Sequence, residues 1–272
     1  MTEHHAAHKR TVIPVLLDLS NFYDRISLEQ LAQRWLESSY PATHAALAMQ
    51  VYTGQRILEA EGEASAPLWA THGILAGDPQ APLAAKVYSL RALKAFHKRF
   101  PQLHSDLWID DFSFDVVDKD PRNAARIAIN AYACVKAELE KDNLKVSEQK
   151  TGFIVSNATV KKILAEQLPE VGPKVHDVMR DLGIDCTAGR LRRIQTMKAR
   201  RRKAGRKNVK LNSLKIPNRA IQLKVYKGSI VSGISWGHQA MGLAPQLRRR
   251  LRATPTTYRK LRHPVRHVPK TS

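Results

Sequence analysis

The apolar positions of the first 185 residues alternate between the spacing of a strand and that of a helix. Residues 11–19, TVIPVLLDL, are β-branched and almost continuously apolar, which predicts a buried strand. Ser27 and Gln30 have the spacing of a capping box, so a helix is expected to begin there. The pattern continues as one or two helices to about Val51, broken near Pro41.

The next segment combines a hairpin, a break and a long helix. Residues 55–74 hold two short apolar runs around the polar turn EGEAS, which predicts a hairpin. Gly77, Asp78 and Pro79 form a break, because glycine and proline interrupt regular structure. Residues 80–100 then carry apolar side chains at helical spacing and predict an amphipathic helix.

A second hairpin is expected around a pair of acids. HSDLWI and FSFDVV read as two short strands, with Asp110 and Asp111 at the tip that joins them. Pro121 suits the first turn of a helix over residues 122–141, and residues 144–155 read as another strand. With the first hairpin set aside, this order predicts an α+β fold of the split β-α-β (ferredoxin-like) type, in which helices cover one face of an antiparallel sheet.

Charge divides the chain at about residue 185. The 272 residues carry 45 Lys and Arg against 24 Asp and Glu, for a net charge of +21. No acid follows Asp185, and 24 of the bases lie in residues 186–272, so the first 185 residues have a net charge of −3. A near-neutral body with a basic extension indicates a polyanionic partner and salt-sensitive binding. Because the extension has no clean apolar face, nucleic acid is favoured over a membrane surface.

Composition excludes several other classes. With 43% hydrophobic and 25% charged residues, the chain is ordinary for a protein that buries a core in one large domain or two small ones. Cys134 and Cys186 are too few for a disulfide framework or a four-cysteine zinc site. No apolar run approaches the roughly 20 residues that span a bilayer, and no secretory signal is present. A soluble intracellular protein is expected.

Three acids stand among apolar neighbours. Asp18 ends the run VIPVLL, and Asp110 and Asp111 interrupt LWI and FSF. Buried carboxylates are costly unless they are paired or bind a metal, and three of them on neighbouring strands can hold two divalent ions about 3.5–4 Å apart. Oxygen ligands of this kind favour Mg²⁺ or Mn²⁺. Taken alone, an Asp-Asp pair is more often an ordinary tight turn.

Five segments give these acids a context. LDLSNFYDRIS, HGILAGDPQAPL, LWIDDFSFDV, NLKVSEQKTGF and DLGID follow one another along the chain. In this order they resemble motifs A to E of reverse transcriptases, particularly those of retroelements without long terminal repeats. The first hairpin likewise resembles one that these enzymes place before motif B. The resemblance covers residues 12–185 and implies the palm domain of a polymerase.

The resemblance implies roles for the acids and for one lysine. Asp18 matches the metal ligand of motif A, with the carbonyl of Leu19 as a backbone ligand. Asp110 and Asp111 match the metal-binding pair of motif C. Lys150 matches the lysine of motif D, a general acid for the pyrophosphate leaving group, although a solvated surface lysine is an equally good interpretation.

The resemblance also implies a nucleotide site between motifs A and B. Tyr23, five residues after Asp18, matches the gate that rejects the 2′-hydroxyl of ribonucleotides, and its alternative is a packed core aromatic. The motif B turn leads into a helix beneath the template and the nucleotide. The residues implied at the nucleotide are Tyr23, Phe22, Gly77, Asp78 and Pro79.

Two departures from the family pattern stand out. Ala76 occupies the position of a motif B glutamine that contacts the nucleotide, so one contact to the substrate is missing. Motif A begins only 17 residues from Met1, which leaves no room for the fingers and their triphosphate-binding basic residues. The chain is therefore expected to be a fragment of a longer reading frame.

The basic extension follows motif E, where a thumb or linker meets the primer–template duplex. Arginine can bridge phosphates, while a nuclear localisation signal or a solvated run is the alternative. The expected organisation is a flexible N-terminus over residues 1–10, a palm-like domain over 11–185 and an extension over 186–272, partly helical and disordered from about residue 247. The residues expected to contact nucleic acid are Leu182, Gly183, Arg190, Arg192, Arg193, Arg200, Arg201, Arg202 and Lys203.

The leading hypothesis is an RNA-directed DNA polymerase that uses two Mg²⁺ or Mn²⁺ ions, an RNA template, a DNA primer and deoxynucleoside triphosphates. An RNA-dependent RNA polymerase shares the palm, but Tyr23 argues against it. A non-catalytic nucleic-acid-binding remnant is the third hypothesis, favoured by the missing fingers and by Ala76. The basic run is consistent with a nuclear location.

Overall fold

The computed structural model describes residues 8, 10–169, 172–189, 193–214, 216 and 218–236. The chain divides into two compact units, Met1–Arg193 and Ile194–Ser272, which are considered separately. Within the described residues, no helix combines the length and the apolar content needed to cross a bilayer.

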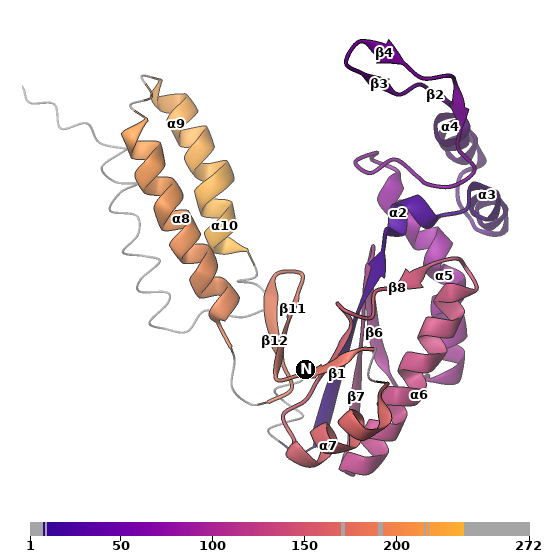
Figure 1. The fold of residues 1–272 in the computed structure, drawn as a ribbon, viewed down its shortest axis with the longest axis vertical. Coiled ribbons are helices and arrows are strands. Elements are labelled where there is room, and N and C mark those ends of the chain that lie inside the picture. Colours follow the sequence, from indigo (N-terminus) through magenta and orange to yellow (C-terminus); the bar gives the residue numbers. More distant parts are fainter. Residues whose placement is uncertain are drawn as a thin grey trace, which may run out of the picture. The chain divides into compact units, whose positions relative to one another are not determined.

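The first unit is built on a six-stranded sheet (Figure 1). Its central strand, β1, pairs with β7 on one side and with β8 and β9 on the other. All pairs are antiparallel except that between β9 and β10. The strands are β1 (Thr11–Ser20), β6 (His104–Trp108), β7 (Asp111–Asp118), β8 (Lys145–Val146), β9 (Gly152–Ile154) and β10 (Lys174–His176).

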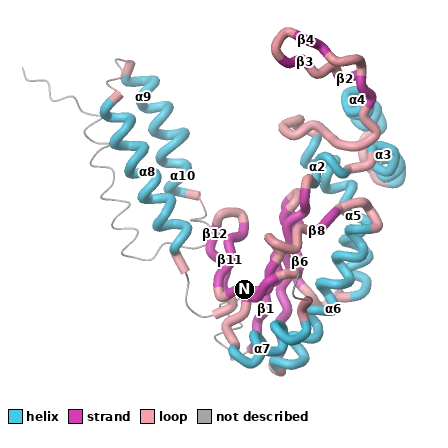
Figure 2. Tube along the Cα trace, in the orientation of Figure 1, coloured by secondary structure: helices cyan, strands magenta, loops and turns pink. Residues whose placement is uncertain are grey.

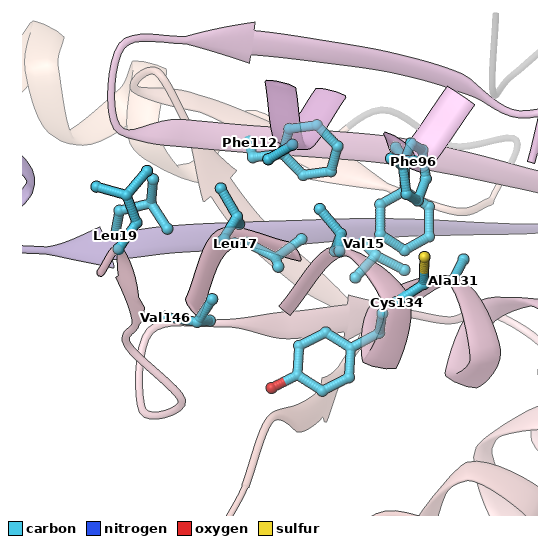
Figure 3. Packing of buried hydrophobic residues seen from close by; sticks show 14 of the residues in the cluster. Val15, Leu17, Leu19, Phe96, Phe112, Ala131, Cys134 and Val146 are labelled. Atoms are coloured by element: carbon cyan, nitrogen blue, oxygen red, sulfur yellow. The ribbon is translucent and has the colours of Figure 1, made fainter. Parts of the chain in front are cut away.

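Two long helices, α5 (Ala81–Arg99) and α6 (Pro121–Glu140), lie along the same face of this sheet (Figures 1 and 2). The alternation along β7 explains why, since Phe112, Phe114 and Val116 are at most 2% exposed while the residues between them are only half-buried. The same periodicity is seen on β1 in Figure 3, where alternate apolar side chains point into the core. The labelled residues of β1 are Val15, Leu17 and Leu19, and those packed near them are Phe96, Phe112, Ala131, Cys134 and Val146. The predicted α+β fold with helices on one face of a mostly antiparallel sheet is confirmed.

The N-terminal helices also follow the prediction. After the short α2 (Phe22–Arg25) come α3 (Leu28–Glu37) and α4 (Ala42–Thr53), separated at Pro41 as expected. Ser27 caps α3 by accepting a hydrogen bond from the Gln30 backbone N–H at 3.4 Å. The reciprocal half of the capping box is absent, because the Ser27 N–H and the Gln30 side chain both bind the hydroxyl of Tyr88 instead.

The first predicted hairpin forms from four very short strands. The pairs are β2 with β5 and β3 with β4, and the turn has left-handed backbone at Glu61 and Gly62. The strands are β2 (Gln55–Arg56), β3 (Glu59–Ala60), β4 (Glu63–Ala64) and β5 (Leu68–Trp69).

The single strand predicted over residues 144–155 is wrong. Ser147 lies in a turn, where its carbonyl accepts hydrogen bonds from the N–H groups of Lys150 and Thr151, so β8 and β9 are separate. The apolar residues on either side of this turn meet the same strand, β1, which is why they resemble one continuous run. The elements that follow are α7 (Ala158–Gln167), β10 and the hairpin of β11 (Val178–Asp181) and β12 (Ile184–Thr187).

In the second unit the basic extension buries apolar side chains, although the sequence indicated no clean apolar face there. Residues of this run form the helix α8 (Gln195–Ser213), and Ala204 and Leu211 are 3% and 5% exposed. Seven residues apart, they lie on one face and pack with Tyr226 and Ile230. The partner elements are α9 (Arg219–Val225), the π-helix η1 (Tyr226–Val231) and α10 (Ser232–Ser235), and the predicted disorder from residue 247 falls outside the described residues.

Candidate active site

The three acids singled out in the sequence come together at one end of the central strand pair. Asp18 and Asp111 stand directly opposite each other in the β1–β7 register. The Leu19 N–H donates to the Asp110 carbonyl at 3.2 Å, which ties the tip of the second hairpin to β1. Strand pairing therefore places the backbones of residues that are more than 90 positions apart in the sequence next to each other.

The tip itself is a two-residue turn. Trp108 pairs with Asp111, so Ile109 and Asp110 form the loop and Asp111 is the first residue of β7. Ile109 has φ +60°, a left-handed conformation that is strained for a β-branched side chain. This turn holds Asp110 at the end of the sheet, beside the partly exposed carboxyl of Asp111.

The electrostatics of the tip show an excess of negative charge. Partial burial, together with the nearby carboxylates of Asp110, Asp181 and Asp18, raises the pKa of Asp111 to about 6. Asp181 lies in the β11–β12 hairpin, and its own pKa is raised by burial and by Asp106. Sequence reasoning did not single out this fourth acid, whose only signal is its position before the Leu182-Gly183 turn.

The donor set suits a hard divalent cation, because oxygen ligands and unneutralised negative charge meet at the same place. The described residues nevertheless contain no group of three or more His, Cys, Asp or Glu side chains gathered tightly enough to form a metal site by themselves. The metal ligands assigned from the sequence, the Leu19 carbonyl among them, stay a prediction.

Lys150 reaches the same acids from the other side of β1. Its Nζ lies 3.1 Å from one carboxylate oxygen of Asp18 and 3.4 Å from the other. The turn that carries it is anchored by the Ser147 N–H, which donates to the Asp18 carbonyl at 2.8 Å. The break between β8 and β9 is thus what brings the lysine to the acids.

Tyr23 lies close to this cluster, and Phe22 supports it from the core. Burial and the nearby Asp110 raise the pKa of Tyr23, which is half-buried. Phe22 is 3% exposed and meets the Tyr23 ring edge-on at 5.7 Å between centroids, so its side chain belongs to the core. The Tyr23 carbonyl also accepts from the Ile74 N–H at 3.1 Å, which links motif A to the segment before Gly77.

The predicted break after this segment is an exposed turn. Gly77 has φ +92°, a conformation that glycine adopts without strain, and Ala76 and Pro79 are exposed beside it. Asp78 holds the turn in place, since one carboxylate oxygen accepts from the Gln80 N–H at 3.1 Å and the other from the Tyr52 hydroxyl at 2.5 Å. Tyr52 was not expected here, because nothing in the spacing of α4 shows that its buried hydroxyl meets this turn.

One comparison gives this arrangement a family. The family model described as "Reverse transcriptase (RNA-dependent DNA polymerase)" matches residues 1–185. The chain belongs to the reverse transcriptase family. The resemblance to reverse transcriptases that the sequence indicated over residues 12–185 is therefore confirmed at the level of the family. No curated protein matches the chain in sequence.

Solved structures with a related fold include telomerases from yeasts. The telomerase of Candida tropicalis in complex with the TWJ fragment of telomeric RNA has a TM-score of 0.51 and 13% identity, over 96% of this chain and 45% of that one. The apo telomerase of the same organism, truncated from the C-terminal domain, gives 0.47 and 15%, over 66% and 35%. The reverse transcriptase chain thus spans between about a third and a half of these telomerase chains.

The remaining residues predicted to contact nucleic acid lie in two places. Leu182 and Gly183, with φ +43° and +79°, form the turn of the β11–β12 hairpin in the reverse transcriptase unit. On α8, Arg202 and Lys203 are exposed, whereas Arg200 and Arg201 are half-buried and have interactions of their own. Arg193 is exposed just before α8, and Arg190 and Arg192 lie outside the described residues.

Proposed function

We propose that this reverse transcriptase copies RNA into DNA, with Asp18, Asp110 and Asp111 as the carboxylates that bind two Mg²⁺ or Mn²⁺ ions. The observation that carries the proposal is the β1–β7 register, which sets Asp18 opposite Asp111 with Asp110 in the adjoining turn. When bound, divalent cations supply activation of the primer 3′-hydroxyl and neutralisation of phosphate charge.

The residues around the acids select the sugar, donate a proton to the leaving group and position the nucleotide. Tyr23 excludes a 2′-hydroxyl from the sugar of the incoming nucleotide, a role supported by its proximity to Asp110 and its packing on Phe22. Lys150 supplies a proton to the pyrophosphate leaving group. The Gly77-Asp78-Pro79 turn, fixed by Tyr52, carries the backbone against which the nucleotide lies.

The basic second unit serves the polymerase by holding the template and primer. Ala204 and Leu211 face the interior of that unit, so the opposite face of α8 presents Lys198, Arg202, Lys203, Arg206 and Lys210, all exposed. Cations on one helical face bind the phosphates of an RNA–DNA hybrid. In the first unit, the Leu182-Gly183 turn of motif E contacts the primer. We assign the chain to a retroelement without long terminal repeats on its motif pattern, and a nuclear location follows from its basic run.

Primer extension tests the proposal. The full chain is given a DNA primer on an RNA template with Mn²⁺ or Mg²⁺, and either deoxynucleotides or ribonucleotides. Extension with deoxynucleotides is expected, and it should be lost in the Asp110→Ala/Asp111→Ala variant. Extension that survives this change contradicts the role of the acids, and a preference for ribonucleotides makes the chain an RNA-dependent RNA polymerase instead.

One observation favours a second candidate function. Ala76 offers the nucleotide no side-chain amide, which suits a chain that binds nucleic acid without copying it. Salt-dependent binding of an RNA–DNA hybrid, with no extension under either metal, would establish this non-catalytic function.

A further inference from the structure

The contact between Lys150 and Asp18 joins residues that are 132 positions apart. The Asp18 side chain is 24% exposed and the Lys150 side chain 69% exposed, so the pair lies at the surface edge of the acid cluster. Both carboxylate oxygens of Asp18 lie within 3.4 Å of the ammonium nitrogen. The lysine thus contacts the same two oxygens that Asp18 would offer to a cation.

The backbone, and not the side chain alone, sets this contact. The Ser147 N–H donates to the Asp18 carbonyl at 2.8 Å, and the Ser147 carbonyl accepts from the Lys150 N–H at 3.1 Å. Immediately after the lysine, Thr151 is fully buried and Gly152 pairs with Leu16 of β1. The backbone on both sides of Lys150 is therefore anchored to β1.

The charges explain why a lysine is useful at this position. Asp110, Asp181 and Asp18 raise the pKa of Asp111, whereas Lys150 lowers it. The lysine thus acts as an internal cation that offsets part of the charge of the cluster. An ion pair this exposed is weak, and a counterion that must leave has to be weakly bound.

We infer that Lys150 and a divalent cation compete for Asp18, so that the lysine neutralises the aspartate in the metal-free protein and is displaced when the cation binds. The inference rests on the proposed function, because the cation in question is the one assigned to these acids. Displacement frees the ammonium group to reach the nucleotide phosphates. The motif D lysine thereby becomes available only once the site is loaded.

Titration calorimetry of the full chain with Mn²⁺ tests the competition without any need for polymerase activity. Lys150→Met removes the competitor and should tighten Mn²⁺ binding about threefold, the effect expected of a weak ion pair. Lys145→Met is the matched control, since Lys145 is an exposed lysine on β8 whose loss removes the same charge from the same side of β1. Lys145→Met should leave the affinity within the error of the wild type.

A further variant tests whether Mn²⁺ affinity depends on the positive charge at position 150. Lys150→Arg keeps a cation at the position and should bind Mn²⁺ as the wild type does. Unchanged or weaker binding in Lys150→Met, or equal tightening in Lys145→Met, would overturn the inference. Absence of Mn²⁺ binding in every variant would instead remove the cation site of the proposed function, so the two failures are distinguishable.

Discussion

The Asp111 carboxyl carries a charge that the fold only partly neutralises. Its pKa is raised to about 6 from an ordinary value of 3.8, because the group is partly buried among other acids. A carboxyl with a raised pKa in the folded state stabilises the protein below its unfolded pKa, and this contribution is lost as the pH rises through about 6. At neutral pH the ionised Asp111 carboxylate therefore destabilises the folded state through burial and repulsion from the neighbouring acids.

Asp111→Asn should consequently raise the melting temperature of the metal-free protein by about 1–3 °C at pH 7.5 or so, after allowance for solvent screening. Thermal unfolding in a chelator measures this. The wild type should gain stability on acidification from about pH 7 to pH 5, and the variant should gain less. A lower melting temperature for the variant at neutral pH would show that the carboxylate is stabilised by partners and not strained.

Asp142 has the opposite character, because it is a buried acid with strong partners. Its side chain is 3% exposed and accepts from Arg34 at 2.6 Å and from Arg91 at 2.8 Å. The Arg34 guanidinium also stacks over the Tyr88 ring, 4.2 Å from its centroid. The three charges join α3, α5 and the end of α6.

Asp142→Ala should cost about 3 kcal/mol of unfolding free energy, because removal of one partner leaves a buried guanidinium unpaired. Urea denaturation measures the loss. Glu140→Ala, which removes a half-exposed acid from the same helix end, should cost less than about 1 kcal/mol. Equal losses of unfolding free energy in the two variants would mean that the buried ion pairs of Asp142 stabilise the protein no more than an exposed ion pair does.

At the scale of elements, the pairing of β9 depends on a glycine. A Cβ at Gly152 would lie 2.7 Å from His176 Cδ2 and 3.0 Å from the Lys174 carbonyl oxygen, and closer still to Met179 Sδ. Gly205 on α8 is the contrasting case, because a Cβ there has no heavy atom within 4 Å. The same substitution should therefore act in opposite directions at the two positions.

Gly152→Ala should destabilise the first unit by about 1–3 kcal/mol through overpacking. Gly205→Ala should stabilise α8 by roughly 0.5–1 kcal/mol, because alanine is the better helix former. Denaturation followed by circular dichroism and by hydrogen exchange in each unit separates the two effects. A stabilising effect of Gly152→Ala would show that, in solution, β10 does not pack against β9 as closely as in the structure.

Elements were predicted from sequence where the pattern was local. The alternation in β7, the cap at Ser27 and the first-turn proline at Pro121 are properties of a few neighbouring residues, and these elements form as expected. The division of residues 144–155 into two strands could not be foreseen, since it depends on a hydrogen bond from Ser147 to distant Asp18. The buried face of α8 was not predicted, because its two buried residues are few among the charges around them.

The candidate site shows the same limit. The sequence placed Asp18, Asp110 and Asp111 in two elements, and the motif order showed that these elements should meet. It gave no sign of the ion pair between Lys150 and Asp18, of Asp181 beside Asp111, or of Tyr52 at the motif B turn. Each of these contacts joins segments with no common periodicity.

The whole molecule combines a near-neutral first unit with a basic second one, and this predicts how it binds nucleic acid. Arg202 and Arg206 lie one turn apart on the exposed face of α8. Their replacement by glutamine should lower the slope of log affinity against log salt for an RNA–DNA hybrid by up to about 2 units, because each phosphate contact contributes about 0.9.

Fluorescence anisotropy over a series of salt concentrations measures this slope. Lys94→Gln/Lys98→Gln on α5 is the matched control, because it removes two exposed charges from the helix behind the sheet. An equal change of slope in both double variants would assign the effect to net charge and not to the α8 face.

In the proposed function, Asp18, Asp110 and Asp111 form one cation site. Trp108 lies opposite Asp111 in the β6–β7 register and is 65% exposed, so it can sensitise the luminescence of Tb³⁺, a cation that also prefers oxygen ligands. A single site at these acids predicts saturable emission that Mg²⁺ displaces, that Trp108→Phe weakens, and that Asp110→Asn/Asp111→Asn removes. Emission of equal strength and affinity in the double aspartate variant would contradict it.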